Sequence, residues 1–214
     1  MKGMKCEKKD MLLYAVTDRS WTGRQTLLEQ IESALKGGIT CLQLREKELE
    51  QEEFLQEACQ VQKLCKSYRI PFVVNDNVEV AIASGADGIH VGQEDMPASK
   101  VRELVGNDMW IGVSAHTVEE ALEAERQGAD YLGVGSMFPT GTKKDVVSTS
   151  FDTLSEICQR VSIPVVAIGG IKQSNMSQLK GIGMDGVALV SAIFGSENIE
   201  EACKKLHKMV VGLL

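Results

Sequence analysis

Several common features are missing from this chain of 214 residues, and each absence excludes a class of protein. None of the six cysteines belongs to a C-x-x-C pair, and most lie in apolar periodic segments, which favours buried reduced thiols over disulfides or a metal–thiolate site. No apolar run reaches the ~18 residues of a membrane span, and no small-residue cleavage site follows the basic residues 1–10. We therefore expect a cytoplasmic protein without a membrane partner.

An excess of positive charge is missing as well. The formal net charge of -7 argues against a nucleic-acid partner bound through a basic face. The chain has no linker and no low-complexity tract, and its 43% hydrophobic and 25% charged residues are ordinary for one globular domain. An anionic ligand would need a local cluster of Lys and Arg.

Short apolar runs alternate with longer helical patterns along the whole chain. The pattern predicts strands at 12–18, 40–45, 71–76, 87–91, 110–114, 131–135, 164–169 and 186–191. It predicts helices at 24–37, 50–67, 78–84, 98–105, 117–127, 150–160, 173–181 and 197–212. Eight such units close a parallel barrel, so we expect a single (β/α)8 TIM barrel over 1–214, with 1–10 a short N-terminal extension.

Three predicted helix-to-strand junctions repeat one phrase, in which glycine is followed two residues later by aspartate. They lie at 85–87, 128–130 and 183–185. Glycine suits the left-handed residue that ends a helix, so the phrase belongs at the bottom of the barrel, away from the chemistry. We expect Asp87, Asp130 and Asp185 to be structural.

Polar residues follow the second predicted strand, where a barrel opens to its ligands. Alternation places Gln43, Arg45 and Lys47 on one side, and Arg with Lys suits a multiply charged oxyanion. The alternative is a salt-bridged cap made with Glu46 or Glu48.

Carboxylates follow the next two predicted strands. Asp76 and Asp95 are hard oxygen ligands of the kind that hold Mg²⁺ together with a substrate phosphate. Alternatively, Asp76 caps the helix from residue 78 and Asp95 is a turn residue. The neighbouring Arg45 and Lys47 favour the metal site. His90, between apolar neighbours, is expected to be packed and hydrogen-bonded.

The remaining strand ends offer hydroxyls and glycines. Ser114 and His116 share a face, but no nucleophile elbow surrounds the serine, so Ser114 is expected to bind substrate and His116 to flank a capped helix. The stretch 136–149 carries hydroxyls, glycine and lysines suited to phosphate, with a solvated basic loop as the alternative. Paired glycines at 169–170 and a helix start after the eighth strand suit a second phosphate.

Six segments, in order, resemble the signature series of the thiamine-phosphate synthase family. They are residues 43–47, 74–76, 90–95, 112–116, 139–144 and 168–171. The resemblance runs from Tyr14 to Ser191. It implies a Mg²⁺-dependent transferase that joins 4-amino-2-methyl-5-pyrimidinylmethyl diphosphate to a thiazole phosphate, with or without an extra carboxylate. The products are thiamine phosphate and pyrophosphate.

The resemblance also implies residue roles, position by position. Asp76 and Asp95 would bind one Mg²⁺ per subunit. The diphosphate would be bound by Arg45, Lys47, Asn75 and Lys143, and the pyrimidine by Gln43 and Ser114. The thiazole phosphate would be bound by Thr140, Thr142, Gly170, Val190 and Ser191. Leu44, Glu46 and Gly141 complete the predicted substrate-binding set, within which Arg45, Lys47, Lys143 and Ser114 are the predicted catalytic residues. Departure of pyrophosphate needs charge neutralisation, so no nucleophile and no obligatory general base are assigned.

Two rival functions stay open. A thiazole tautomerase of the same superfamily would use His116 as acid and base and would not need a diphosphate–metal site. A catalytically silent sensor of phosphate ligands could keep the glycine site but would have no reason to keep both aspartates. A homo-oligomer is left open.

Overall fold

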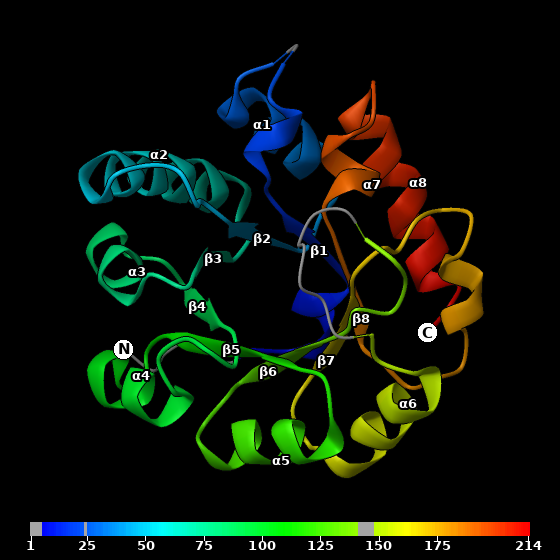
Figure 1. Ribbon diagram of the computed structural model, residues 1–214. Coiled ribbons are helices and arrows are strands. Elements are labelled where there is room, and N and C mark those ends of the chain that lie inside the picture. Colours follow the sequence, from blue (N-terminus) through cyan, green and yellow to red (C-terminus); the bar gives the residue numbers. More distant parts are fainter. Residues whose placement is uncertain (1–5, 24, 141–147) are drawn as a thin grey trace.

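Eight parallel strands pair in chain order and close into a barrel, with β1 bonded to both β2 and β8. The computed structural model describes residues 6–23, 25–140 and 148–214. Figure 1 shows the strands at the centre with the helices around them. The strands are β1 Leu13–Val16, β2 Cys41–Leu44, β3 Phe72–Asn75, β4 Gly88–Val91, β5 Trp110–Ala115, β6 Tyr131–Val134, β7 Val165–Ile168 and β8 Gly186–Leu189. The predicted TIM barrel is confirmed.

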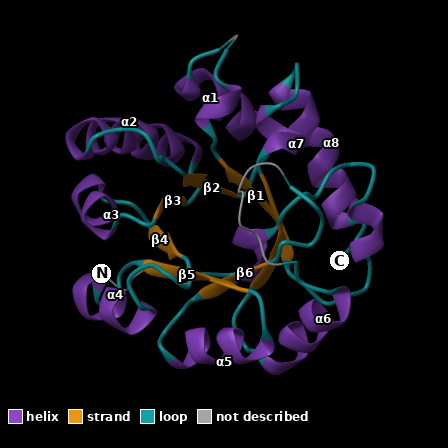
Figure 2. Cartoon of the chain, viewed as in Figure 1, coloured by secondary structure: helices purple, strands orange, loops and turns teal. Residues whose placement is uncertain are grey.

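The outer ring of helices follows the predicted alternation (Figure 2). The α-helices are α1 Leu27–Lys36, α2 Gln51–Tyr68, α3 Val78–Ser84, α4 Ala98–Val105, α5 Val118–Arg126, α6 Phe151–Arg160, α7 Ser191–Phe194 and α8 Ile199–Val211. Short 3-10 turns occur at η1 Lys8–Met11, η2 Arg19–Trp21 and η3 Met176–Leu179. No helix in the described part of the chain combines the length and the apolar character needed to cross a membrane.

The predicted helix at 173–181 is wrong, because only the 3-10 turn η3 forms there. The side chain of Asn175 accepts from the backbone N–H of Lys172 at 2.7 Å and donates to the Gly170 carbonyl at 3.0 Å. Such local side-chain bonds compete with the backbone bonds of an α-helix.

Two apolar clusters fill the fold. The larger lies between the strands and the helices and includes Leu42, Leu44 and Val74. The smaller is formed by the opposite face of the strands and includes Tyr14, Trp110 and Tyr131. Strands covered on both faces read as nearly continuous apolar runs, which is why their sequences are so readily recognised.

The repeated aspartates at the strand entrances bind backbone, as expected. Each accepts a hydrogen bond from an N–H at or beside the start of the preceding strand. The pairs are Asp87 with Phe72 at 2.9 Å, Asp130 with Ile111 at 2.8 Å, and Asp185 with Val165 at 2.9 Å. Thr40 does the same for Leu13 at 2.9 Å. The prediction that these aspartates are structural is confirmed.

Candidate active site

The carboxyl ends of the eight strands meet at one mouth, because all the strands are parallel. Gln43 lies in β2, Asn75 ends β3, Ser114 lies in β5 and Ser191 begins α7. The predicted residues Gly141, Thr142 and Lys143 lie outside the described residues.

Two hollows gather many of the predicted residues. The first, of about 650 Å³, is lined by Thr140, Gly170 and Ser191, three of the residues predicted for the thiazole phosphate. The second, of about 520 Å³, is lined by Lys47 and Asn75, which were predicted for the diphosphate, and by Asp76, which was predicted for the metal. Glu46, a member of the wider predicted substrate-binding set, lines it as well. The structure therefore places these predicted residues in two groups. Six other predicted residues in the described part of the chain line neither hollow, namely Gln43, Leu44, Arg45, Asp95, Ser114 and Val190.

Lys172 is a cation at the first hollow that the sequence analysis missed. It lines this hollow together with Asp18 and Gln173, and its side chain is exposed. The available signal was its position two residues after Gly170, at the end of the Gly-Gly segment. A lysine here adds positive charge beside the predicted phosphate residues.

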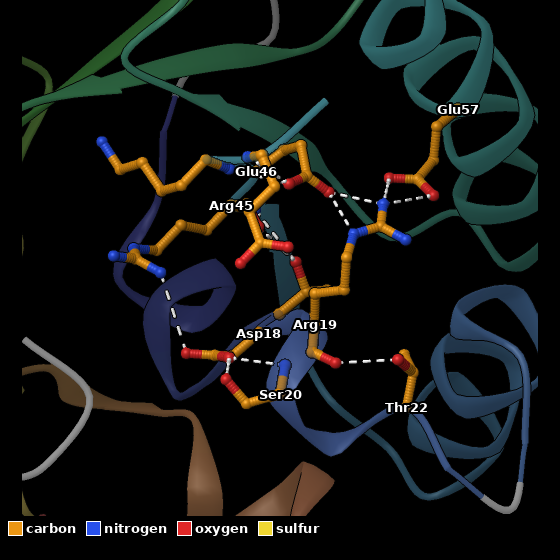
Figure 3. Close-up of polar contacts among 10 residues, drawn as sticks. Asp18, Arg19, Ser20, Thr22, Arg45, Glu46 and Glu57 are labelled. Carbon is orange, nitrogen blue, oxygen red and sulfur yellow. Dashed lines mark hydrogen bonds and ion pairs between the residues drawn. The ribbon is translucent and has the colours of Figure 1, made fainter. Parts of the chain in front are cut away.

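Glu46 is held in place from several sides (Figure 3). Its Oε2 accepts from Arg19 Nε at 2.7 Å, and its Oε1 accepts from the backbone N–H of Lys47 at 2.8 Å and of Glu48 at 2.9 Å. Burial opposes ionisation of Glu46, but the bonds from Arg19 and the backbone outweigh it and lower the pKa of the carboxyl. Arg19 continues to both oxygens of Glu57 at 3.0 and 2.9 Å, tying the chain after β2 to α2.

The sequence left open a salt-bridged cap in which Arg45 and Lys47 pair with Glu46 or Glu48. The ion pairs of the structure are different. Glu46 pairs with Arg19, whereas Arg45 Nη1 lies 3.7 Å from Asp18 Oδ2 and Lys47 pairs with Asp76. Asp18 is itself fixed by the backbone N–H of Ser20 at 2.9 Å, as Figure 3 shows. A direct role of Glu46 in substrate binding stays a prediction, since its carboxylate already supports the loop.

Asp76 is not the cap of α3, so that alternative is wrong. The N-cap is Asn77, whose side chain accepts from Val80 N–H. Asp76 has φ of 62°, a left-handed conformation that is uncommon outside glycine. Its N–H donates to the His90 carbonyl at 2.8 Å, and its carboxylate pairs with Lys47 at the second hollow.

Asp95 takes part in a turn. Its Oδ2 accepts a hydrogen bond from the N–H of Gly92 at 2.7 Å, and Asp95 is exposed to solvent. Within the described ranges, no cluster of three or more His, Cys, Asp or Glu is arranged for a metal ion. Asp76 and Asp95 follow the adjacent strands β3 and β4, and their carboxylates are the type of donor that suits Mg²⁺, which uses one or two carboxylates and takes its other ligands from water and phosphate.

The histidines behave as expected from the sequence. His90 is buried, with Nδ1 3.1 Å from the Tyr131 hydroxyl and Nε2 3.0 Å from Ser114 Oγ. Burial lowers its pKa to about 4, against a smaller opposing effect of Asp95, so the ring is neutral at neutral pH. His116 donates its backbone N–H to Glu120 at the start of α5 and contacts the Gly135 carbonyl oxygen through Nδ1. Both predictions, the packed His90 and the His116 beside a capped helix, are confirmed.

Comparisons with known proteins show which family the chain resembles. A family model described as thiamine monophosphate synthase matches residues 13–193. A thiamine-phosphate synthase of Clostridium botulinum (strain Eklund 17B / Type B) is 49% identical over 201 residues, which cover 94% of each chain. One of Clostridium beijerinckii (strain ATCC 51743 / NCIMB 8052) is 50% identical over 199 residues, covering 93% of this chain and 95% of that protein.

A solved structure is similar over almost the whole fold. The thiamine phosphate pyrophosphorylase from Pyrococcus furiosus superposes with a TM-score of 0.88 at 40% identity, covering 97% of this chain and 98% of that one. Sequence and architecture agree over nearly the whole chain, and the chain belongs to the thiamine-phosphate synthase family.

Proposed function

We propose that this chain, as a thiamine-phosphate synthase, joins 4-amino-2-methyl-5-pyrimidinylmethyl diphosphate to a thiazole phosphate and releases pyrophosphate. The observation that carries the proposal is the pair of hollows at one barrel mouth. One offers Lys47, Asn75 and Asp76, and the other offers a glycine and hydroxyls at Gly170, Thr140 and Ser191. Two phosphorylated substrates require two such places.

The second hollow is assigned to the diphosphate. Lys47 and Arg45 supply positive charge to the leaving oxygens, and the Asn75 side chain supplies hydrogen bonds. Mg²⁺, held by Asp76 and Asp95 and by the phosphates, would neutralise the charge of the departing pyrophosphate. Asp18 pairs with the guanidinium of Arg45, and the Glu46 carboxylate accepts a hydrogen bond from the backbone N–H of Lys47.

The first hollow is assigned to the thiazole phosphate. The backbone of Gly170 and the hydroxyls of Thr140 and Ser191 offer hydrogen bonds, and Lys172 adds charge. Gln43 and Ser114 are assigned to the pyrimidine. Loss of pyrophosphate leaves a carbon cation next to the aminopyrimidine, which the thiazole nitrogen attacks. The residues act by holding both rings close together, and none is assigned as nucleophile.

The test is a reaction with purified protein, both substrates and Mg²⁺. Thiamine phosphate and pyrophosphate are expected in equal amounts. Conversion of a thiazole phosphate alone, lost in His116→Ala, would instead identify the tautomerase. Binding of phosphate compounds without any turnover would identify the sensor.

Asp76→Asn tests the metal site within this function. Asparagine tolerates the left-handed backbone of Asp76 and keeps its shape, but it removes the charge. We expect turnover to fall by ~10²-fold or more, with an unchanged circular dichroism spectrum. Glu103→Gln, an exposed carboxylate on α4, is the matched control and should keep full activity. Full wild-type activity with a chelator present would remove the metal from the proposal.

A further inference from the structure

A continuous run of hydrogen bonds crosses the barrel interior between Gln43 and Ser114. Gln43 Nε2 donates to the Tyr14 hydroxyl at 2.9 Å, and that hydroxyl lies 2.7 Å from the Tyr131 hydroxyl. Tyr131 then reaches His90 Nδ1 at 3.1 Å, and His90 Nε2 reaches Ser114 Oγ at 3.0 Å. The two ends of the run are the residues assigned to the pyrimidine. We name the three residues between them, Tyr14, Tyr131 and His90, the relay.

The three relay residues are buried, and they fit because the neighbouring Gly112 carries no side chain. Tyr14 is 1% exposed, Tyr131 0% and His90 8%. A Cβ on Gly112 would lie 2.1 Å from Tyr131 Cζ and 2.5 Å from His90 Nδ1. Buried hydroxyls and imidazoles are costly unless paired, so this interior accepts polar groups only as a connected set.

The direction of the bonds follows from Gln43. Its amide nitrogen donates to Tyr14, so the Tyr14 hydrogen is available for the Tyr131 oxygen. Tyr131 then donates to His90 Nδ1, and a neutral imidazole carries its one hydrogen on the other nitrogen. His90 Nε2 therefore donates to Ser114, whose own hydrogen is left for a ligand.

The opposite direction leaves a buried hydroxyl with only a weak acceptor. Tyr14 would then receive hydrogens from both Gln43 and Tyr131, and its own hydrogen would be left to the Cys41 thiol. Sulfur is a weaker acceptor than the Tyr131 oxygen, so this direction is disfavoured. At the other end, the Gln43 carbonyl oxygen is left to accept from a ligand.

We propose that the relay sets the hydrogen-bonding polarity of Gln43 and Ser114, so that the site selects an aminopyrimidine over an oxopyrimidine. This rests on the proposed function. Tyr14, Tyr131 and His90 are positioning residues, since they act through the two residues that touch the substrate. An aminopyrimidine offers an N–H₂ donor for the Gln43 oxygen and a bare ring nitrogen for the Ser114 hydrogen. An oxopyrimidine presents a carbonyl to the Gln43 oxygen, which leaves two acceptors opposed, and it replaces the ring nitrogen that accepts the Ser114 hydrogen with an N–H.

Tyr131→Phe tests the relay. Without this hydroxyl, His90 can move its hydrogen to Nδ1, and Ser114 is no longer held as a donor. We expect the KM for the pyrimidine diphosphate to rise ~10-fold, the amino-over-oxo preference to fall ~10-fold, and the KM for the thiazole phosphate to stay unchanged. Tyr68→Phe is the matched control, because the Tyr68 hydroxyl binds Glu32 on the outside of the barrel.

A double-mutant cycle separates positioning from a merely structural effect. If Tyr131 acts through Ser114, then Tyr131→Phe adds little to the loss already caused by Ser114→Ala, whereas a structural effect adds in full. Tyr14→Phe is the second variant and should lower the same preference if Tyr131→Phe does not fold. A folded variant with unchanged KM and unchanged preference overturns the relay. A wild-type protein that makes no thiamine phosphate would instead overturn the proposed function.

Discussion

Asp76 and Glu46 are both carboxylates at the barrel mouth, yet their surroundings suit them to different uses. Asp76 pairs with Lys47, whose side chain is 51% exposed, and an exposed ion pair stabilises a protein little. Its carboxylate can therefore turn to a cation at small cost. Glu46 is 3% exposed at its side chain and is bonded to Arg19 and two backbone N–H groups, so withdrawing it would leave three partly buried donors without this acceptor.

His90 predicts a pH dependence of stability. Burial holds its folded pKa near 4, below the ordinary 6.5, so between these values the unfolded chain binds a proton that the folded chain does not. The free energy of unfolding should therefore fall as the pH drops through this window, by up to about 1.4 kcal/mol per pH unit. Urea unfolding at several pH values, compared with His90→Gln, measures this contribution. The same pH dependence in both proteins would contradict it.

At the scale of elements, three of the junctions that precede strands share one feature, an aspartate that accepts a hydrogen bond from the backbone of the preceding strand. Asp87, Asp130 and Asp185 each follow a helix end and reach back to an N–H of the preceding strand. The aspartate thus ties two neighbouring strands together at the end of the barrel opposite the mouth. Residues that stabilise the fold therefore lie at one end of the strands and the predicted site residues at the other end, as is usual in this fold.

Asp87→Ala should destabilise the protein without changing its chemistry. The substitution leaves the Phe72 N–H without its side-chain acceptor, and we expect a loss of about 1–3 kcal/mol in the free energy of unfolding. Activity per folded molecule should stay unchanged. Asp108→Ala, at an exposed aspartate, is the control and should change stability by less than about 0.5 kcal/mol. A large fall in kcat for the folded Asp87→Ala protein would place this residue in the site instead.

At the scale of the whole molecule, closure between β1 and β8 completes the barrel. Gly186 begins β8 where the backbone of η1 crosses the bottom, and a Cβ there would lie 2.0 Å from the Met11 carbonyl oxygen. Backbone cannot yield as a flexible side chain can. This close approach requires glycine.

Gly186→Ala should therefore weaken the entire fold. We expect a loss of about 3 kcal/mol or more, seen as a lower urea midpoint for every spectroscopic probe. Gly23→Ala is the matched control, because a Cβ at Gly23 meets nothing within 4 Å. Equal stability of the two variants would show that η1 gives way at the bottom of the barrel.

The alternation of apolar strands and amphipathic helices could be predicted from the sequence, because strands buried on both faces of a parallel sheet consist of apolar residues. Strand order then placed Asn75, Asp76 and Ser114 at one mouth without any coordinates. The helix predicted at 173–181 was wrong because the Asn175 side chain bonds the backbone of Lys172 and Gly170, and hydrophobic periodicity does not reveal such a competition.

Pairings across the barrel could be decided only by the folded chain. Arg19 with Glu46, Lys47 with Asp76, and the relay from Gln43 to Ser114 join residues on different strands and loops. Their hydrogen bonds depend on distances of a few tenths of an ångström and on burial, which arise when the sheet closes. Sequence pattern determines which faces are buried, whereas the direction of a bond between two buried hydroxyls depends on every partner around them.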